Sequence, residues 1–173
     1  MDVIHLRAAV LEDERRLAFL DRATWSVANS PVPLWDGSTD FFASDPVENV
    51  IVAELDGTPV GYVKLRAVHE YGADRAVLSI SGIAVDPGHQ RQGIGDRLIG
   101  EVIEEAGRRG ATRLVLHVLS TNSAAIDLYA SNGFSVSTVR SDAFFLGGRS
   151  VDDLVMERSL VDDQLRNLPR KAG

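Results

Sequence analysis

Short runs in which apolar and polar residues alternate predict the strands in the first half of the chain. Residues 3–10 (VIHLRAAV) alternate in this way and read as a strand. Residues 49–68 hold two β-rich runs on either side of Asp56-Gly57, which is a strong hairpin signal. A further strand is expected over residues 75–87, stopped by its final Asp-Pro pair. Between the first strand and the hairpin, residues 11–25 begin with acidic residues and continue with helical apolar spacing, which predicts a helix.

The second half contains a long amphipathic pattern followed by shorter elements. Apolar residues at helical spacing over residues 93–110 predict a helix with one buried face, whose members are Ile94, Leu98, Ile99, Val102, Ile103 and Ala106. A strand over residues 112–119, a short helix within 121–134 and two closing strands around a turn at 147–150 follow. This order predicts an α/β (α+β) fold with a mixed, mostly antiparallel central sheet of about seven strands flanked by helices.

The segment over residues 26–49 interrupts the pattern. It holds prolines, a glycine and aromatic residues, so we expect a folded lid with a short helix near residues 38–44. We expect residues 1–160 to form one domain that includes this lid, and residues 161–173 to form a flexible polar tail.

Composition excludes several classes of function. The chain has 173 residues, a formal net charge of −7 and no cysteine. An acidic chain lacks the clustered basic surface that general nucleic-acid binding needs. Without cysteine there is no disulfide, thiolate metal site or cysteine nucleophile, and the four histidines lack metal-ligand spacing, so we expect no metal. No apolar run could span a membrane and no secretory signal opens the chain, so we expect a cytoplasmic protein that does not bind membranes.

The loop GHQRQGIG (residues 88–95) precedes the long helix and has two interpretations. Gly93 and Gly95 would let the backbone approach a phosphate at the helix N-terminus. A strand-to-helix turn that needs small residues would look the same. The P-loop pattern fails at Asp96-Arg97, and the dinucleotide pattern fails at Leu98. The two glycines alone therefore leave both interpretations open.

Two motifs together resemble the GNAT superfamily of acyl-CoA-dependent N-acyltransferases. The first is QRQGIG (residues 90–95), which has the form of the family's acyl-CoA loop, Q/R-x-x-G-x-G/A. The second combines an Asn, an Ala-rich turn, a Tyr and a Gly-Phe pair, here Asn122, Ala125, Tyr129, Gly133 and Phe134. The resemblance covers about residues 3–160, with little contribution from the lid. It implies a GNAT-like sheet, acetyl-CoA as cosubstrate and direct transfer of its acetyl group to an amine.

By this resemblance, backbone groups at the end of the fourth strand hold the pantetheine arm, and one of their N–H groups is the oxyanion donor that acyl transfer requires. The amides of the glycine loop hold the pyrophosphate. The residues implied for cofactor binding are Ile83, Ala84, Val85, Gln90, Arg91, Gln92, Gly93, Ile94, Gly95, Asp96, Asn122 and Tyr129.

Tyr129 and His117 are the expected catalytic residues. Spacing alone favours a structural role for Tyr129 as a core aromatic residue. The resemblance instead implies that Tyr129 is the acid that protonates the departing thiolate. Some family members place a Glu base on the fourth strand, where this chain has Ser79. In the family's ribosomal-protein N-terminal acetyltransferases, a Glu five residues before the motif Asn matches the position of His117, and an imidazole suits a base. A structural role for His117, a base among residues 69–71, and ordered water remain open.

Acceptor specificity is expected in aromatic residues of the lid and the closing hairpin, with Asp142 or Asp152 pairing a cationic amine. Ordinary core aromatics and surface carboxylates remain the alternative for each. The expected partner is a small-molecule or peptide amine, and related enzymes are often homodimers. Two competing functions are a non-catalytic acyl-CoA-binding sensor and a nucleotide-binding domain. The aromatic residues are Trp25, Trp35, Phe41, Phe42, Phe144 and Phe145.

Overall fold

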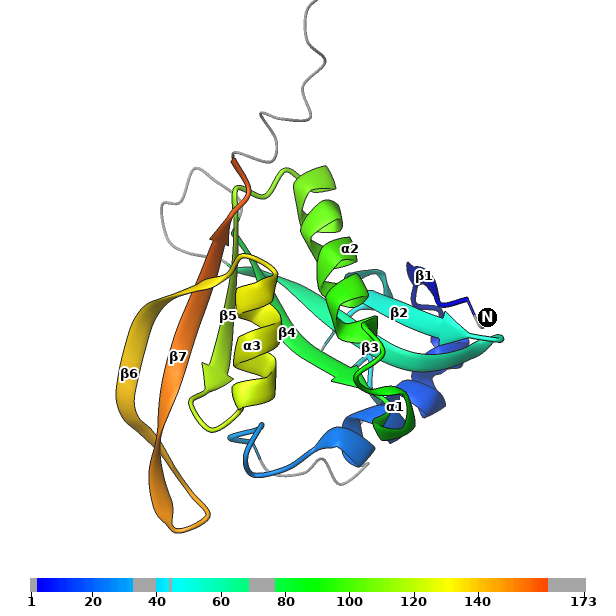
Figure 1. Ribbon diagram of the computed structural model, residues 1–173. Helices are drawn as coiled ribbons and strands as arrows, with labels where there is room; N and C mark the ends of the chain where they lie inside the picture. Colours follow the sequence, from blue (N-terminus) through cyan, green and yellow to red (C-terminus); the bar gives the residue numbers. More distant parts are fainter. Residues whose placement is uncertain (1–2, 33–39, 44, 69–76, 162–173) are drawn as a thin grey trace, which may run out of the picture.

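Seven strands form one mixed sheet in the order β1-β2-β3-β4-β5-β7-β6 (Figure 1). The structure is a computed structural model that describes residues 3–32, 40–43, 45–68 and 77–161. Among the described strands, β4 and β5 pair in parallel and all other neighbours are antiparallel, which confirms the predicted sheet. The strands are β1 His5–Ala8, β2 Val50–Leu55, β3 Thr58–Val68, β4 Val77–Val85, β5 Arg113–Leu119, β6 Ser135–Leu146 and β7 Arg149–Ser159.

Helices cover both faces of the sheet. Helices α2 (Ile94–Arg108) and α3 (Ser123–Ser131) lie on one face, and α1 (Glu14–Thr24) lies on the other (Figure 1). Short 3₁₀ turns precede α1, β2 and α2, at Leu11–Asp13, Val47–Asn49 and Pro87–His89. Among the described helices, none is long and apolar enough to cross a membrane.

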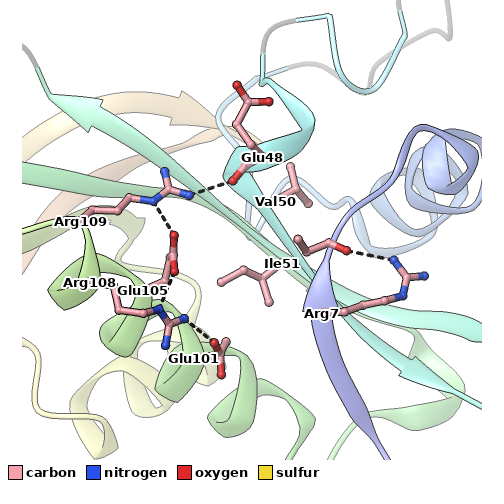
Figure 2. A pocket seen from close by; sticks show the side chains of 9 residues that line it. Arg7, Glu48, Val50, Ile51, Glu101, Glu105, Arg108 and Arg109 are labelled. Carbon is pink, nitrogen blue, oxygen red and sulfur yellow. Dashed lines mark hydrogen bonds and ion pairs between the residues drawn. The ribbon is translucent and has the colours of Figure 1, made fainter.

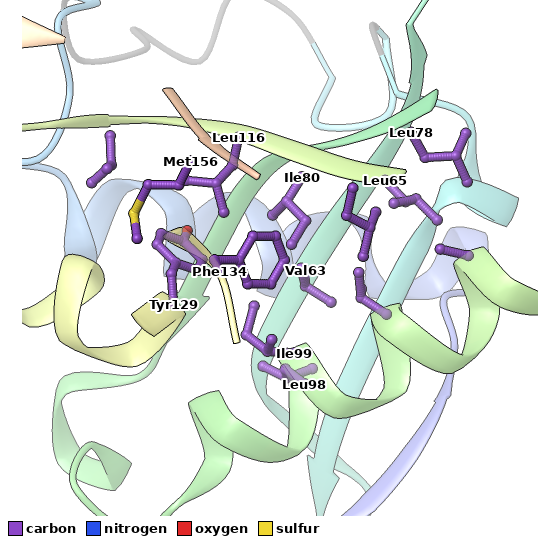
Figure 3. Packing of buried hydrophobic residues seen from close by; sticks show 14 of the residues in the cluster. Val63, Leu65, Leu78, Ile80, Leu98, Ile99, Leu116, Tyr129, Phe134 and Met156 are labelled. Carbon is purple, nitrogen blue, oxygen red and sulfur yellow. The ribbon is translucent and has the colours of Figure 1, made fainter. Parts of the chain in front are cut away.

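The larger hydrophobic core lies between the sheet and the helices α2 and α3. The predicted apolar face of α2 is buried there, with Leu98, Ile99 and Val102 fully inaccessible. Figure 3 shows this face against Val63 of β3, with Tyr129 and other residues of the α3 end beside it. Each fully buried aliphatic side chain of this kind stabilises the fold by about 1.5–3 kcal/mol. The helix is therefore fixed by its sequence pattern, and its N-terminus is held beside the end of β4.

A second core lies under α1. Leu17 and Leu20 of α1 pack with Val50, Val52 and Tyr62 of the sheet. Phe41 belongs to the same cluster, with its ring edge-on to Tyr62 at a centroid distance of 5.0 Å.

Buried ion pairs attach the end of the predicted lid to β3. Asp45 is 2% exposed and lies 3.3 Å from Lys64 Nζ and 2.7 Å from Arg66 Nε. The Lys64 ammonium also lies 3.8 Å from the centroid of the Phe41 ring. Burial by itself would raise the pKa of Asp45, but the hydrogen bond from Arg66 and the two positive charges hold it below the ordinary 3.8. This part of the predicted lid is therefore fastened to the sheet.

The closing hairpin differs from the prediction. The sequence pattern predicts closing strands over residues 134–140 and 151–160 around a turn at 147–150, whereas β6 continues to Leu146 and β7 already begins at Arg149. A bulge interrupts the pairing of β6 with β7 between Arg140 and Phe144, where Asp142 has a φ of +53°. The pairing resumes at Phe144. The predicted helix near residues 38–44 lies largely outside the described residues, and residues 40–43 form a turn closed by Ala43 N–H donating to the Asp40 carbonyl.

Candidate active site

The parallel strands β4 and β5 separate halfway along their length. Their last pair joins Ile80 to Leu116, although β4 continues to Val85 and β5 continues to Leu119. Beyond that pair the two strands form no ladder, so the sheet opens between them. The β5 edge of Ile83–Val85 therefore has backbone groups that no neighbouring strand uses, since β3 pairs only with the opposite edge.

The loop that follows β4 is shaped by its own hydrogen bonds. Asp86 accepts from the Gly88 N–H at 2.9 Å, and the Gln90 side chain donates to the Val85 carbonyl at 3.0 Å. The Gly88 hydrogen bond and the nearby Arg16 guanidinium hold the pKa of Asp86 below its ordinary value. Arg91 and Gly93 both have positive φ, at +62° and +77°. These contacts turn the chain back so that it enters α2 directly beside the open end of β4.

The N-terminus of α2 fits a pyrophosphate group. Its first amides have no acceptor within the helix and carry the positive end of the helix dipole. A Cβ added at Gly93 would meet no protein atom within 4 Å, so the approach to these amides is clear. Arg91 and Gln92 are exposed beside it. This geometry favours the phosphate-cradle interpretation of the glycine loop over a bare turn.

Three of the predicted loop contacts can only be made by backbone atoms. The Ile94 side chain is 1% exposed and lies in the core. The Asp96 carboxylate accepts from Asn132 Nδ2 at 2.9 Å, which ties α2 to the end of α3. A Cβ added at Gly95 would lie 3.2 Å from the Leu128 side chain. Gly95, the second glycine of the motif, therefore allows α2 to pack closely on α3.

Helix α3 carries the second motif. The Asn122 side-chain oxygen caps the helix by accepting from Ala125 N–H at 3.2 Å, a bond that competes with the cofactor-binding role implied for this residue. Tyr129 is 6% exposed and its ring packs against Phe134 (Figure 3). Its hydroxyl makes no hydrogen bond to any other residue that the structure describes. Burial raises the pKa of Tyr129 to about 12, so the phenol keeps its proton at neutral pH.

His117 lies on β5 at the point where the strands separate, and its side chain is on the other face of the sheet. It directly follows Leu116, the last paired residue, and alternates with the buried Leu116 and Val118. Its side chain is 55% exposed, and its Nδ1 lies 2.8 Å from Asp153 Oδ2. Tyr129 and His117 thus come from opposite faces of the sheet, on either side of the opening.

The described residues that were predicted to bind the acceptor do not line one common pocket. Trp25 is half-buried and its Nε1–H donates to the Val32 carbonyl, while Phe41 is 6% exposed and belongs to the second core. Phe42 packs edge-on against Phe41. In the closing hairpin, Phe144 is half-buried and Phe145 is 77% exposed. Trp35 and residues 69–71 lie outside the described residues.

The two carboxylates proposed for a cationic amine form contacts within the hairpin. Asp152 Oδ1 accepts from the Asp142 N–H at 2.9 Å, and Asp142 accepts from the Ser150 hydroxyl. The start of the predicted lid does reach the opening, because Thr121 Oγ1 donates to the Ala28 carbonyl at 2.9 Å. The segment after α1 therefore borders the turn between β5 and α3.

Sequence reasoning missed Asp153 and Arg140. Asp153 is 3% exposed, and the Arg140 guanidinium lies 3.1 Å from the same Oδ2 that contacts His117. The sequence offers only the pair Asp152-Asp153 within a strand, which does not say which of the two turns toward β5. The register of β7 against β5 decides this point.

A separate pocket lies at the far end of α2 (Figure 2). It lies between the C-terminal half of α2 and the edge formed by β1 and Val47–Asn49. Arg108 contacts Glu101 and Glu105 there, and Arg109 contacts Glu105 and the Glu48 carbonyl. These charges are paired with one another, and the hydrogen bond from Arg109 to the Glu48 carbonyl attaches the end of α2 to the sheet edge. Among the described residues, no cluster of three His, Asp or Glu side chains could hold a metal ion.

Comparisons with known proteins agree with this geometry. The sequence model of the acetyltransferase (GNAT) family matches residues 10–134. The [ribosomal protein bS18]-alanine N-acetyltransferase of Escherichia coli K12 is 36% identical over 122 residues, covering 70% of this chain and 78% of that protein. The crystal structure of smu.2055 from Streptococcus mutans UA159 has a TM-score of 0.82 at 29% identity, covering 90% of this chain and 99% of that one. The ribosomal-protein-S18-alanine N-acetyltransferase structure from Escherichia coli has a TM-score of 0.73 at 26% identity, covering 91% and 94%.

Proposed function

Because the chain belongs to the acetyltransferase (GNAT) family and is an acetyl-CoA-dependent N-acetyltransferase, we propose that it acetylates the primary amine of a peptide or small molecule, with His117 as base and Tyr129 as acid. The observation that carries this assignment is the opening between β4 and β5. It separates a buried, protonated phenol on one face from an exposed imidazole on the other. Transfer through such an opening needs a proton acceptor on the amine side and a proton donor on the thiol side.

The chain's own residues would hold the cosubstrate in two places. Amides at the N-terminus of α2, next to Gly93, would bind the pyrophosphate. The edge of β4 at Ile83–Val85 that no strand pairs with would bind the pantetheine amides, and one of its N–H groups would donate to the thioester oxygen as negative charge develops. Acetyl-CoA supplies the electrophilic thioester carbon.

The proton transfers balance with these two side chains. The amine nitrogen forms a bond to the carbonyl carbon while the carbon–sulfur bond breaks. His117 Nε2 takes the proton that the amine loses, and Tyr129 gives its hydroxyl proton to the sulfur. Solvent then removes the proton from His117 and returns one to Tyr129, so both groups are restored.

Two observations support a peptide amine among the possible acceptors. One relative carries an alanine of ribosomal protein bS18 in its name as the group that it acetylates. The face around His117 is also bordered by strands on one side and by the segment after α1 on the other, joined at Thr121 and Ala28. An imidazole that is 55% exposed on this face is within reach of an extended chain end. A small amine needs fewer contacts and is the other class of acceptor that we propose.

An acceptor screen tests the proposed function. Purified protein and acetyl-CoA are incubated with peptides that have a free amino-terminal alanine, with amino acids and with polyamines, and products are detected by mass. We expect acetylation of at least one primary amine together with release of free thiol. Binding of acetyl-CoA without thiol release for any amine would favour the non-catalytic acyl-CoA sensor.

The same assay tests the base. His117→Ala is expected to lower kcat by about 10²-fold, because a positioned general base contributes at least that factor. His5→Ala is the matched control, since His5 is exposed on β1 at the opposite edge of the sheet. An unchanged kcat in His117→Ala would show that water or another group is the base.

A further inference from the structure

The carboxylate of Asp153 is placed to orient His117. It lies on β7, paired in register with Leu119 of β5, so its side chain is on the same face as His117. Asp153 Oδ2 lies 2.8 Å from His117 Nδ1, and the Asp153 side chain is only 4% exposed. A buried carboxylate at this distance accepts a hydrogen bond and cannot donate one when ionised, so the shared proton belongs on Nδ1.

Arg140 completes the arrangement from β6. Its guanidinium Nη1 lies 3.1 Å from the same Asp153 oxygen, and its side chain is 59% exposed. A buried carboxylate without a cationic partner would carry a large desolvation cost. Arg140 offsets that cost and leaves His117 as the second partner. Strands β5, β7 and β6 therefore contribute His117, Asp153 and Arg140, and Asp153 contacts both of the other residues.

From this geometry we propose that Asp153 is a positioning residue for acetyl transfer, which rests on the proposed role of His117 as base. It holds neutral His117 as the Nδ1–H tautomer, so the unprotonated Nε2 is the nitrogen that can take a proton from the acceptor amine. The ring has two nitrogens, and only one tautomer can act at the exposed side. A carboxylate that accepts from Nδ1 selects that tautomer and fixes the orientation of the ring.

The tautomer is measured directly on the wild-type protein. Nitrogen-15 NMR spectra of histidine-labelled protein, recorded at a pH where the imidazole is neutral, distinguish Nδ1–H from Nε2–H, and His117→Gln assigns the signal. We expect the Nδ1–H form in the wild type and a shift toward the Nε2–H form in Asp153→Asn, whose amide can donate to Nδ1. A wild-type His117 in the Nε2–H form would overturn the proposal. This readout needs no acceptor, so it stays informative even if the proposed function fails.

A double-variant cycle supplies the kinetic test. With acetyl-CoA and a short peptide that has a free amino-terminal alanine, Asp153→Asn is expected to lower kcat by about 10- to 100-fold with little change in KM for acetyl-CoA. In the His117→Gln background the same change should have almost no further effect, because the two residues act as one unit. An undiminished loss in that background would show that Asp153 acts independently of His117 and would refute the proposal.

Controls separate positioning from folding. Glu157→Gln is the matched carboxylate-to-amide change on the same strand and face, where Glu157 pairs with Arg113 at 3.2 Å, and it should leave kcat and the His117 tautomer unchanged. Thermal unfolding of each variant identifies any loss of folded protein. A variant with a normal Tm and wild-type tautomer but reduced kcat would also count against the proposal. If no acceptor is acetylated by the wild type, the proposed function fails while the tautomer result still decides the role of Asp153.

Discussion

At the scale of single residues, Tyr129 shows how burial prepares a side chain for proton donation. The fold places it at 6% exposure, with its ring against Phe134 and its hydroxyl without a hydrogen-bond partner among the described residues. The hydroxyl oxygen is nevertheless not one of the fully inaccessible polar atoms, so it is within reach of solvent or of a bound ligand. A tyrosine whose ring is fixed in the core and whose hydroxyl is accessible can present that proton to a ligand in the opening.

Tyr129→Phe keeps the buried ring and removes no hydrogen bond within the described residues, so it is expected to leave the free energy of unfolding nearly unchanged while it lowers kcat. Because the raised pKa of Tyr129, about 12, keeps the proton on the hydroxyl, the loss should be similar across the neutral range. We expect a decrease in kcat of about 10- to 100-fold and nearly unchanged acetyl-CoA affinity. Equilibrium denaturation and steady-state kinetics measure the two effects, and an unchanged kcat would remove Tyr129 from its proposed role.

Gly93 combines a backbone requirement with a clear approach for a ligand. Its φ of +77° is unfavourable for a side chain with a Cβ, although a Cβ would meet no protein atom. Gly93→Val should lower stability by about 1–2 kcal/mol through strain and also weaken acetyl-CoA binding. Gly93→Asn, which tolerates this φ, should lose less stability but still bind more weakly. Calorimetric titration tests this, and normal affinity in both variants would contradict a phosphate site at this loop.

At the scale of elements, the packing of α2 on the sheet depends on a glycine of β3. A Cβ at Gly61 would lie 3.0 Å from the Ala84 carbonyl and 3.2 Å from Leu98 Cδ1. The backbone carbonyl cannot move without disturbing β4 at the open end. The position of α2, and with it the glycine loop, is thus set by close contact between two strands and one helix.

Gly61→Ala is expected to lower the free energy of unfolding by about 1–3 kcal/mol, because the added methyl group overpacks this contact. Gly100→Ala is the matched control in α2, where an added Cβ would meet no atom within 4 Å. Since alanine is the better helix former, this control should raise stability by about 0.5–1 kcal/mol. Urea denaturation compares the two, and equal effects of the same sign would contradict the packing argument.

At the scale of the whole molecule, buried carboxylates paired with cations attach the segments around α1 and before β2 to the sheet. Asp13 accepts from Arg7 at 2.7 Å and joins the start of α1 to β1, and Asp45 joins the end of the predicted lid to β3. Burial would raise the pKa of Asp13, but hydrogen bonds from Arg7 and the Val10 N–H lower it below 3.8. Both carboxylates thus have lower pKa values in the folded state than in the unfolded chain.

Stability should therefore fall on acidification. A carboxylate with a lowered folded pKa contributes fully above its unfolded value, near 3.8, and the contribution disappears as the pH falls through the folded pKa. Asp45→Asn should lower the free energy of unfolding at neutral pH by about 2–3 kcal/mol and reduce its decrease below about pH 4. Glu157→Gln, which changes a half-buried pair at the surface, should cost less than about 1 kcal/mol. A wild-type pH dependence in Asp45→Asn would contradict this account.

The order of elements and the site motifs were predictable because they depend on local patterns. Period-two and period-3.6 spacing predicted the strands and the buried face of α2, and the glycine loop and the Asn-Tyr motif lie where sequence placed them. The extension of the last two strands was missed, since the bulge at Asp142 interrupts the alternation. Phe41 was expected to line an acceptor site, and only its contacts with Tyr62 and Lys64 show it to be a core residue.

The sequence by itself determined the elements, the family and the residue types available for catalysis, because side-chain periodicity and short motifs are properties of neighbouring residues. Only the tertiary structure decided where β4 and β5 separate, that the Tyr129 ring is buried, and that Asp153 faces His117. These features arise from register and packing between segments far apart in the chain. Asp153 lies 36 residues beyond His117, and the pairing of β7 with β5 alone brings the two together.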